Sequence, residues 1–199
     1  RNRVQSVVID KSKNDGSGIG ATTLNNGLIY GNYPFGTRVE DSLISLNTPD
    51  IITIHSVFES SDTQDPSAPK LTLSSILSAS TTTEEYIVGE LLTGQTSGAA
   101  AIVAEKLSSN QISVLYKNDS VFKEGESILS SESQFTATIT VLQSPSFDIS
   151  SNYSFDNGQE ATIYNYGAIE KKADADSPTK KVIVYFASGS YDPTDTGDI

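Results

Sequence analysis

The sequence lacks cysteine, methionine and tryptophan, and it contains a single histidine, His55. Without cysteine the chain has no disulfide framework, no thiolate nucleophile and no zinc–thiolate site. Without methionine, Arg1 is not a translational start. We therefore expect the chain to be an excerpt from a longer polypeptide, with a processed or engineered product as the alternative.

The chain is also poor in positive charge. Its 13 Lys and Arg residues are outnumbered by 25 Asp and Glu residues, which gives a formal net charge of −12 at pH 7. Such a surface repels phosphate groups, so we expect neither nucleic acid nor an anionic membrane surface as a partner. No window approaches the roughly 18 consecutive apolar residues of a membrane-spanning helix, and the beginning shows no apolar signal-peptide region.

The residues that are present favour strands and turns over helices. Ser, Thr, Gly, Asn and Asp dominate, hydrophobic residues make up 36%, and the only aromatic residues are 9 Tyr and 7 Phe. A chain of 199 residues forms one domain or two and can bury about 70% of its unfolded surface. The composition predicts an all-β fold with less than about a tenth of the residues in helix.

One stretch of the chain occurs in two versions. Residues 88–103 read VGELLTGQTSGAAAIV, and residues 124–139, at an offset of 36, read EGESILSSESQFTATI. The matched pairs are Gly89 with Gly125, Glu90 with Glu126, Leu92 with Ile128, Ser97 with Ser133, and Ala101 with Ala137. An even offset preserves the alternation of side chains along a strand, so matched residues are expected to face the same way in both copies.

Each copy carries one apolar strand face. Phe135, Ala137, Ile139 and Val141 alternate with threonines in the second copy, and Ala99, Ala101 and Val103 occupy the matching face in the first. A further alternating strand, with Ile112, Val114 and Tyr116, lies between the copies. Because neither apolar face can be buried alone, we predict that residues 84–142 form a small two-fold β-barrel or a small sandwich.

The repeat also carries a family resemblance. The pattern GE-x-x-TG-x-TSGA-x-A-x-V in residues 89–103 resembles a module of very large virion structural proteins of tailed phages of marine bacteria, cyanophages in particular. Residues 38–60, RVEDSLISLNTPDIITIHSVFES, and residues 155–172, FDNGQEATIYNYGAIEKK, are similar to segments that flank this module. The phage segments usually read DNGQR followed by an aromatic pair, where this chain has Glu160 and Ala161. The resemblance covers about two thirds of the chain and implies a structural role without a catalytic motif.

The flanks of the repeat read as further strands, at residues 4–9, 28–33, 38–46, 51–60, 161–169 and 180–187, while residues 71–78 fit a strand or a short helix. We expect 161–169 and 180–187 to form an antiparallel pair. Residues 60–70 are a linker candidate. The predicted domains are a β-sandwich of residues 1–70 with 146–199, in which Val7, Ile54, Val184 and Phe186 share one core, and an inserted barrel, 84–142. A string of three small domains is the competing arrangement.

The candidate site residues all have a simpler structural interpretation. On the strand 51–60, Ile52, Ile54 and Phe58 are expected to share the apolar face. His55 falls on the opposite, polar face, where a solvated surface role is expected. Asp10, Ser12, Asn14 and Asp15 resemble the opening of a calcium loop, but Ala21 occupies the position of the required glutamate. Five tyrosines, at 153, 164, 166, 185 and 191, suit cross-strand packing or a sugar-binding platform.

These observations predict no catalytic, cofactor-binding or metal-binding residue and no cofactor. With no phosphate loop and no recognisable carboxylate pair, we do not expect an enzyme. The leading hypothesis is a structural module of a phage virion, in the tail, baseplate or a fibre, whose partners are other virion subunits. Self-association and a host-surface glycan remain open as further partners. The alternative is a bacterial cell-surface adhesin or glycan-binding module.

Overall fold

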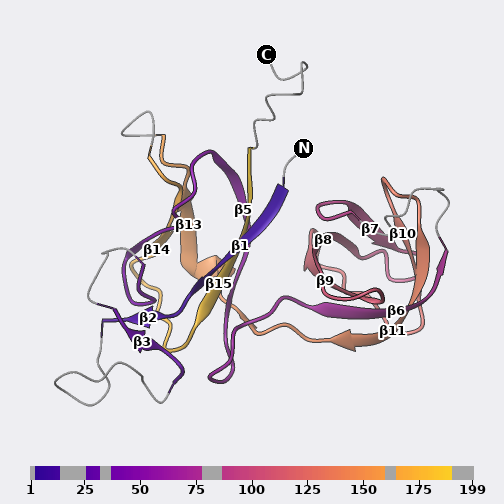
Figure 1. Cartoon of the computed structure of the whole chain (residues 1–199), viewed down its shortest axis with the longest axis horizontal. Coiled ribbons are helices and arrows are strands. Elements are labelled where there is room, and N and C mark those ends of the chain that lie inside the picture. Colours follow the sequence, from indigo (N-terminus) through magenta and orange to yellow (C-terminus); the bar gives the residue numbers. More distant parts are fainter. Residues whose placement is uncertain (1–2, 14–25, 32–36, 78–86, 160–164, 190–199) are drawn as a thin grey trace. The chain divides into compact units, whose positions relative to one another are not determined.

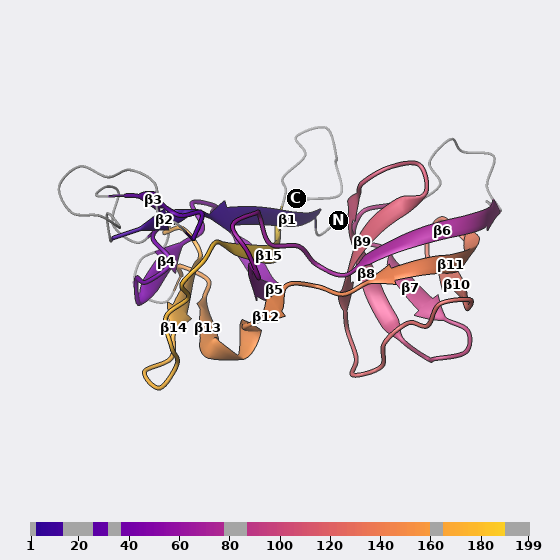
Figure 2. The ribbon, with the colours of Figure 1, turned by 90° about the horizontal axis from the view of Figure 1, so that it is seen from below.

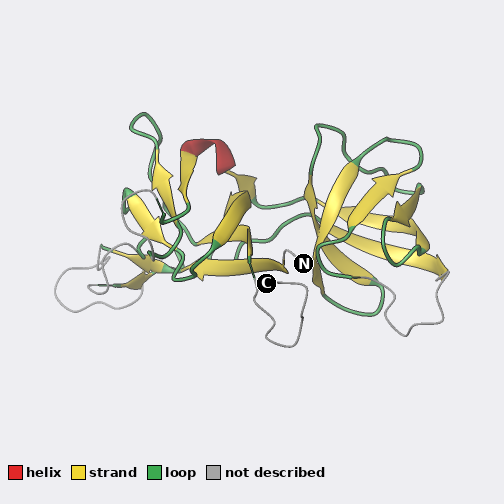
Figure 3. Cartoon of the chain, turned by 90° about the horizontal axis from the view of Figure 1, so that it is seen from above, coloured by secondary structure: helices red, strands yellow, loops and turns green. Residues whose placement is uncertain are grey.

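The computed structural model describes residues 3–13, 26–31, 37–77, 87–159 and 165–189. Strands account for 50% of the described residues and helix for 2%. Among the described residues the helical part is one short 3-10 turn, η1 (Ser150–Asn152), which is drawn in red in Figure 3. The predicted all-β fold is therefore confirmed.

The chain divides into two compact units, Arg1–Asp65 with Asp148–Ile199, and Pro66–Phe147. The boundary after Asp65 lies inside the linker candidate, residues 60–70. The strands that form the sheets of the first unit are β1 (Arg3–Ile9), β2 (Lys11–Ser12), β3 (Ile29–Tyr30), β4 (Leu43–Ser45), β5 (Ile51–Glu59), β12 (Phe147–Asp148), β13 (Tyr153–Asp156), β14 (Ala168–Lys171) and β15 (Val182–Ser188). The strands of the second unit are β6 (Lys70–Leu77), β7 (Leu91–Gly94), β8 (Ala100–Lys106), β9 (Gln111–Tyr116), β10 (Ser127–Ser130) and β11 (Thr136–Gln143).

The first unit contains a four-stranded sheet in the order β1-β15-β5-β12, a three-stranded sheet β13-β14-β4, and the short parallel pair β2-β3 (Figure 1). Every residue of β15 is buried, as its apolar run predicts for a strand covered on both sides. Val184 and Phe186 lie in the main core of this unit, and Val7 and Ile54 pack against it. Strands from both ends of the chain thus share one core. Its description as a β-sandwich stays a prediction.

The second unit is a closed barrel of six antiparallel strands (Figure 2) in the order β10-β11-β6-β9-β8-β7. Matched residues of the repeat have matched partners: Leu92 pairs with Ala101 between β7 and β8, and Ile128 pairs with Ala137 between β10 and β11. Where β7 meets β10, Thr93 lies opposite Leu129, its own counterpart in the repeat. A pseudo-two-fold axis therefore passes through this seam.

The third strands of the two halves, β9 and β6, are not similar in sequence, yet they follow the same symmetry. Val103 of β8 pairs with Val114 of β9, and its counterpart Ile139 of β11 pairs with Leu73 of β6. β6 is thus the structural counterpart of β9, although it precedes both copies of the repeat. Of residues 71–78, the described part, 71–77, forms a strand within β6. The predicted barrel boundary at residue 84 is wrong, because an open five-stranded sheet would leave the apolar core uncovered without β6.

Two other details of the first unit differ from the sequence-based expectation. β14 and β15 do not pair, because β14 lies between β13 and β4 while β15 lies between β1 and β5. On β5, Ile52 was expected on the face shared with Ile54 and Phe58, but it is 52% exposed. Register shifts in the pairing with β15 skip His55 and Ile52, and each extra residue changes which face the following side chains occupy.

Several predicted features fall wholly or partly outside the described residues. These are the strand end at 32–33, residues 161–164 of the aromatic segment 161–169, and the polar loop from Asn14 to Ala21 with its calcium-like spacing. Tyr164 and Tyr191 also lie outside. Of the segment 38–46, the part that forms a strand is β4, Leu43–Ser45.

We predict that Ala137→Asp destabilises the protein by about 3 kcal/mol or more, because it buries an unpaired carboxylate in the barrel. Ala137 is 2% exposed and its counterpart Ala101 is 0% exposed. Urea denaturation at pH 7 measures the loss. Thr136→Asp, on the neighbouring exposed position, is the matched control and should change the free energy of unfolding little. Equal effects of the two substitutions would contradict the two-fold packing.

We also predict that residues 66–146 can be excised and replaced by a short Gly/Ser linker without unfolding the first unit, whose edge strand β12 begins at Phe147. The N–H of Ser67 donates to Ser146 Oγ at 3.0 Å, and the N–H of Ser146 donates to the carbonyl of Ser67 at 2.9 Å, so the ends of the excised segment are adjacent. The expected result is a cooperative thermal transition with a β-type circular dichroism spectrum. Excision of 84–142, which leaves β6 without its barrel partners, is the control and should aggregate. A non-cooperative product of the first excision would refute the prediction.

Candidate functional site

Two buried carboxylates fasten the halves of the barrel to each other. Glu90, from the first copy of the repeat, accepts hydrogen bonds from Ser133 of the second copy, from its N–H at 3.1 Å and from its hydroxyl at 2.8 Å. It also accepts one from the N–H of Ile87 at 2.7 Å. Glu90 is 1% exposed. Ionised carboxylates are strong acceptors, and burial is tolerated only when such donors are supplied.

The second carboxylate repeats this arrangement in the opposite direction. Glu126, from the second copy, accepts hydrogen bonds from Ser97 of the first copy, from its N–H at 3.0 Å and its hydroxyl at 2.9 Å. The N–H groups of Lys123 and Thr96 donate as well, at 2.5 Å and 3.2 Å. Each glutamate therefore binds the serine of the other copy. We call this pair of contacts the crossed glutamate clasp.

The residues around the clasp explain the rest of the repeated pattern. Gly89 and Gly125 immediately precede the glutamates and adopt positive φ angles of 93° and 85°, which other residues adopt only with strain. The absence of a side chain at Gly94 leaves room for the carboxylate, because a Cβ at this position would lie 2.8 Å from Oε2 of Glu126. Its counterpart Ser130 instead adds a hydroxyl 2.8 Å from that of Ser133. The matched residues of the repeat thus build the clasp and the turns that hold it.

Burial alone would raise the pKa of the Glu126 carboxyl. The hydrogen bonds from the N–H of Ser97, the N–H of Lys123 and the Ser97 hydroxyl favour the charged form and outweigh burial, so the pKa is lowered from its usual value. Unfolding removes these donors. The Glu126 contacts of the clasp therefore contribute stability that is present above the normal glutamate pKa and is lost as the pH falls through the lower pKa of Glu126 in the folded state.

A pocket in the first unit offers a different kind of site. Its lining residues come from β5, η1, β13 and β14. Its lining is a mixture of apolar, hydroxyl and imidazole side chains: Ile54, His55, Val57, Ser150, Tyr153, Ser154, Phe155 and Ile169. None of these side chains carries a full charge other than a protonated histidine, so the lining suits a neutral ligand with both polar and apolar surfaces.

The two serine hydroxyls of this pocket are held by hydrogen bonds, whereas the buried hydroxyl of Tyr153 has no hydrogen-bond partner among the described residues. The Ser150 hydroxyl donates to Asp148 Oδ1 at 2.6 Å and accepts the N–H of Val57 at 2.8 Å. The Ser154 hydroxyl donates to the carbonyl of Glu170 at 3.3 Å. Burial, with a smaller contribution from the charge of Glu59, raises the pKa of Tyr153 to about 12, so this phenol is neutral at physiological pH.

His55 and the tyrosines are placed differently from what the sequence suggested. His55 is half-buried rather than fully solvated, because it is the extra residue of a β5 bulge and lines the pocket. The three tyrosines of the set that the structure describes do not share one exposed face. Tyr153 and Tyr185 are buried, and Tyr185 packs edge-on against Phe58, whereas Tyr166 is exposed. Neither the pocket nor the clasp was predicted. The clasp had a signal in the matched glutamates and serines.

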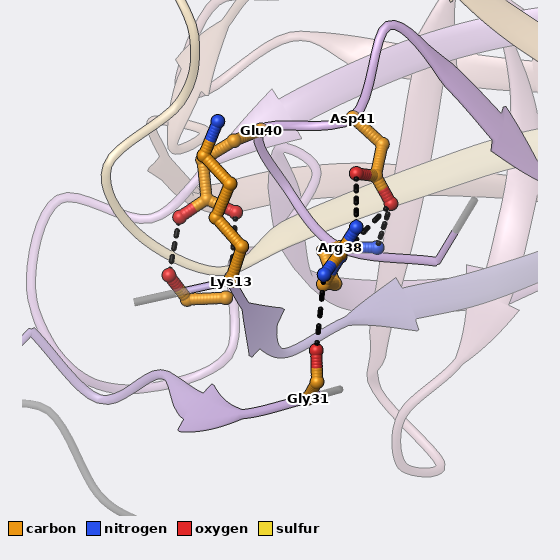
Figure 4. Close-up of polar contacts among 6 residues, drawn as sticks. Lys13, Gly31, Arg38, Glu40 and Asp41 are labelled. Carbon is orange, nitrogen blue, oxygen red and sulfur yellow. Dashed lines mark hydrogen bonds and ion pairs between the residues drawn. The ribbon is translucent and has the colours of Figure 1, made fainter. Parts of the chain in front are cut away.

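A polar cluster near β2 and β3 braces the backbone (Figure 4). Arg38 forms an ion pair with Asp41 at 3.0 Å and donates to the carbonyl of Gly31 at 3.4 Å. Glu40 accepts the hydroxyl of Ser12 and the N–H of Lys13. Ser12, one of the calcium-like positions, therefore serves this brace. The described parts of the chain contain no cluster of three or more His, Cys, Asp or Glu residues that could hold a metal ion.

No known protein family, curated protein or solved structure matches this chain. Within the ranges that the structure describes, no helix is long and apolar enough to cross a membrane.

We predict that Glu126→Gln lowers the free energy of unfolding at pH 7 by about 2 kcal/mol or more, because the amide keeps one acceptor and directs N–H groups at the donors of Ser97 and Lys123. The difference from the wild type should shrink below about pH 4.5, where the free glutamate protonates. Urea denaturation at pH 7, 5 and 3 measures both effects. Glu170→Gln, at an exposed position, is the control. A difference that does not depend on pH would contradict a clasp made by an ionised carboxylate.

Proposed function

We propose that this chain is a structural module of a phage virion protein, from the tail, the baseplate or a fibre, and that it acts by assembly and spacing rather than by chemistry. The resemblance of three segments, in the same order, to large virion proteins motivates the proposal. The observation that carries it is the crossed glutamate clasp. It joins both halves of a closed barrel over a core of fully buried side chains.

A spacer module must keep its shape when neighbouring subunits pull on it. In the barrel, all six strands are hydrogen-bonded on both sides, and the carboxylate contacts add charge-assisted bonds between the halves. Other virion subunits would then dock on the open strand edges of the first unit. β1 has a strand partner on one side only among the described strands, and it is rich in valine.

The second candidate function is a glycan-binding module of a bacterial cell surface. The pocket around His55 and Phe155 is the observation that favours it. The first function places the protein on phage particles and the second places it on the bacterial envelope, so locating the protein distinguishes the two.

We expect antibodies raised against this chain to label purified phage particles at the tail in immunogold electron microscopy. Mass spectra of the same particles should contain peptides from residues 88–103 and from residues 124–139, in a band that migrates as one long polypeptide. An antibody against an unrelated acidic β-protein is the labelling control. Recovery of the chain in the bacterial envelope fraction, with unlabelled particles, would overturn the virion proposal and support the adhesin.

A further inference from the structure

We propose that the pocket of the first unit binds a neutral saccharide, through His55, Ser150, Ser154 and Phe155. This inference does not depend on the spacing role proposed above. It deepens the second candidate function, glycan binding, by naming the ligand class and the residues that would bind it. A module of either origin, virion or cell surface, could carry such a site.

The chemistry of the lining selects the class of ligand. Ile54, Val57 and Ile169 provide the apolar part of the lining. The two serine hydroxyls already donate their hydrogens within the protein, so they offer acceptor oxygens to a ligand, and the imidazole of His55 adds further polar atoms. Saccharides combine hydroxyl groups with apolar C–H faces, and both kinds of surface find partners here. The net charge of −12 disfavours sulfated or sialylated glycans, so the expected ligand is uncharged.

The aromatic side chain at the pocket supplies a stacking surface. Phe155 lies on β13 and is 38% exposed, although a phenylalanine in a sheet would gain stability from full burial. Its ring is available to the C–H face of a sugar, an interaction of the same kind as other contacts of aromatic rings with apolar groups.

The polar groups are fixed before any ligand arrives. The hydrogen bonds of Ser150 to Asp148 and Val57, and of Ser154 to Glu170, hold both hydroxyls in place. The bulge at His55 turns the imidazole toward the pocket, and bulges commonly re-aim side chains at binding sites. Ordering costs on binding are therefore small.

The test uses the full chain on an array of neutral oligosaccharides built from glucose, galactose, mannose and N-acetylglucosamine, followed by saturation-transfer NMR with the glycans retained. We expect at least one neutral glycan to bind, and Phe155→Ala to weaken it about tenfold or more. His55→Gln is the second variant and should also weaken binding. Phe147→Ala removes a ring that is 62% exposed and does not line the pocket, so it should bind like the wild type.

Thermal unfolding of each variant shows whether a loss of glycan binding comes from misfolding. Because the two variants lie at separate positions, binding can still be tested with one if the other does not fold. The proposal is overturned if no neutral glycan is retained, or if sulfated or sialylated glycans are retained in preference. It is equally overturned if binding survives both Phe155→Ala and His55→Gln. None of these results depends on whether the antibody labels phage particles.

Discussion

The burial of two carboxylates is the constraint from which the barrel's repeated sequence follows. An ionised glutamate inside a small barrel is unstable unless several donors surround it, and the chain supplies them from a serine seven residues beyond the equivalent glutamate of the other copy. The glycine before each glutamate bends the backbone so that a nearby N–H also reaches the carboxylate. Glycine, glutamate and serine are thus one structural unit, and the contact requires both copies at once.

The sequence predicted which residues are equivalent but not which residues touch. The offset of 36 paired Glu90 with Glu126 and Ser97 with Ser133, and the alternation of side chains predicted a common apolar face. Nothing in a repeat says that each glutamate contacts the serine of the opposite copy. β6 was missed for a related reason. Leu71 and Leu73 fill the place that Ile112 and Val114 fill in β9, so apolar character alone is shared, and the chain order is permuted.

The first unit was harder to predict because its strands are irregular. Strand period two gives the facing of a side chain only while the register is unbroken. On β5 the extra residues Ile52 and His55 break the register. As a result Ile52, which was expected to be buried, is exposed, and His55, which was expected to be solvated, is half-buried. The sheet partners of β14 and β15 are also set by tertiary packing, and a short loop between two strands does not by itself make them neighbours. A pocket built from such irregularities leaves no sequence pattern.

The two units therefore differ in what they offer to other molecules. In the barrel every strand has hydrogen-bonded neighbours on both sides, so its backbone provides no edge for another strand to join. In the first unit, β1 and β12 end one sheet and β13 and β4 end another, within the described part of the chain. Edge strands and the pocket beside β13 are the features through which β-proteins recognise partners. The barrel is therefore the rigid unit, because its strands are hydrogen-bonded on both sides. The first unit is the one suited to recognition, because its edge strands leave backbone donors and acceptors available.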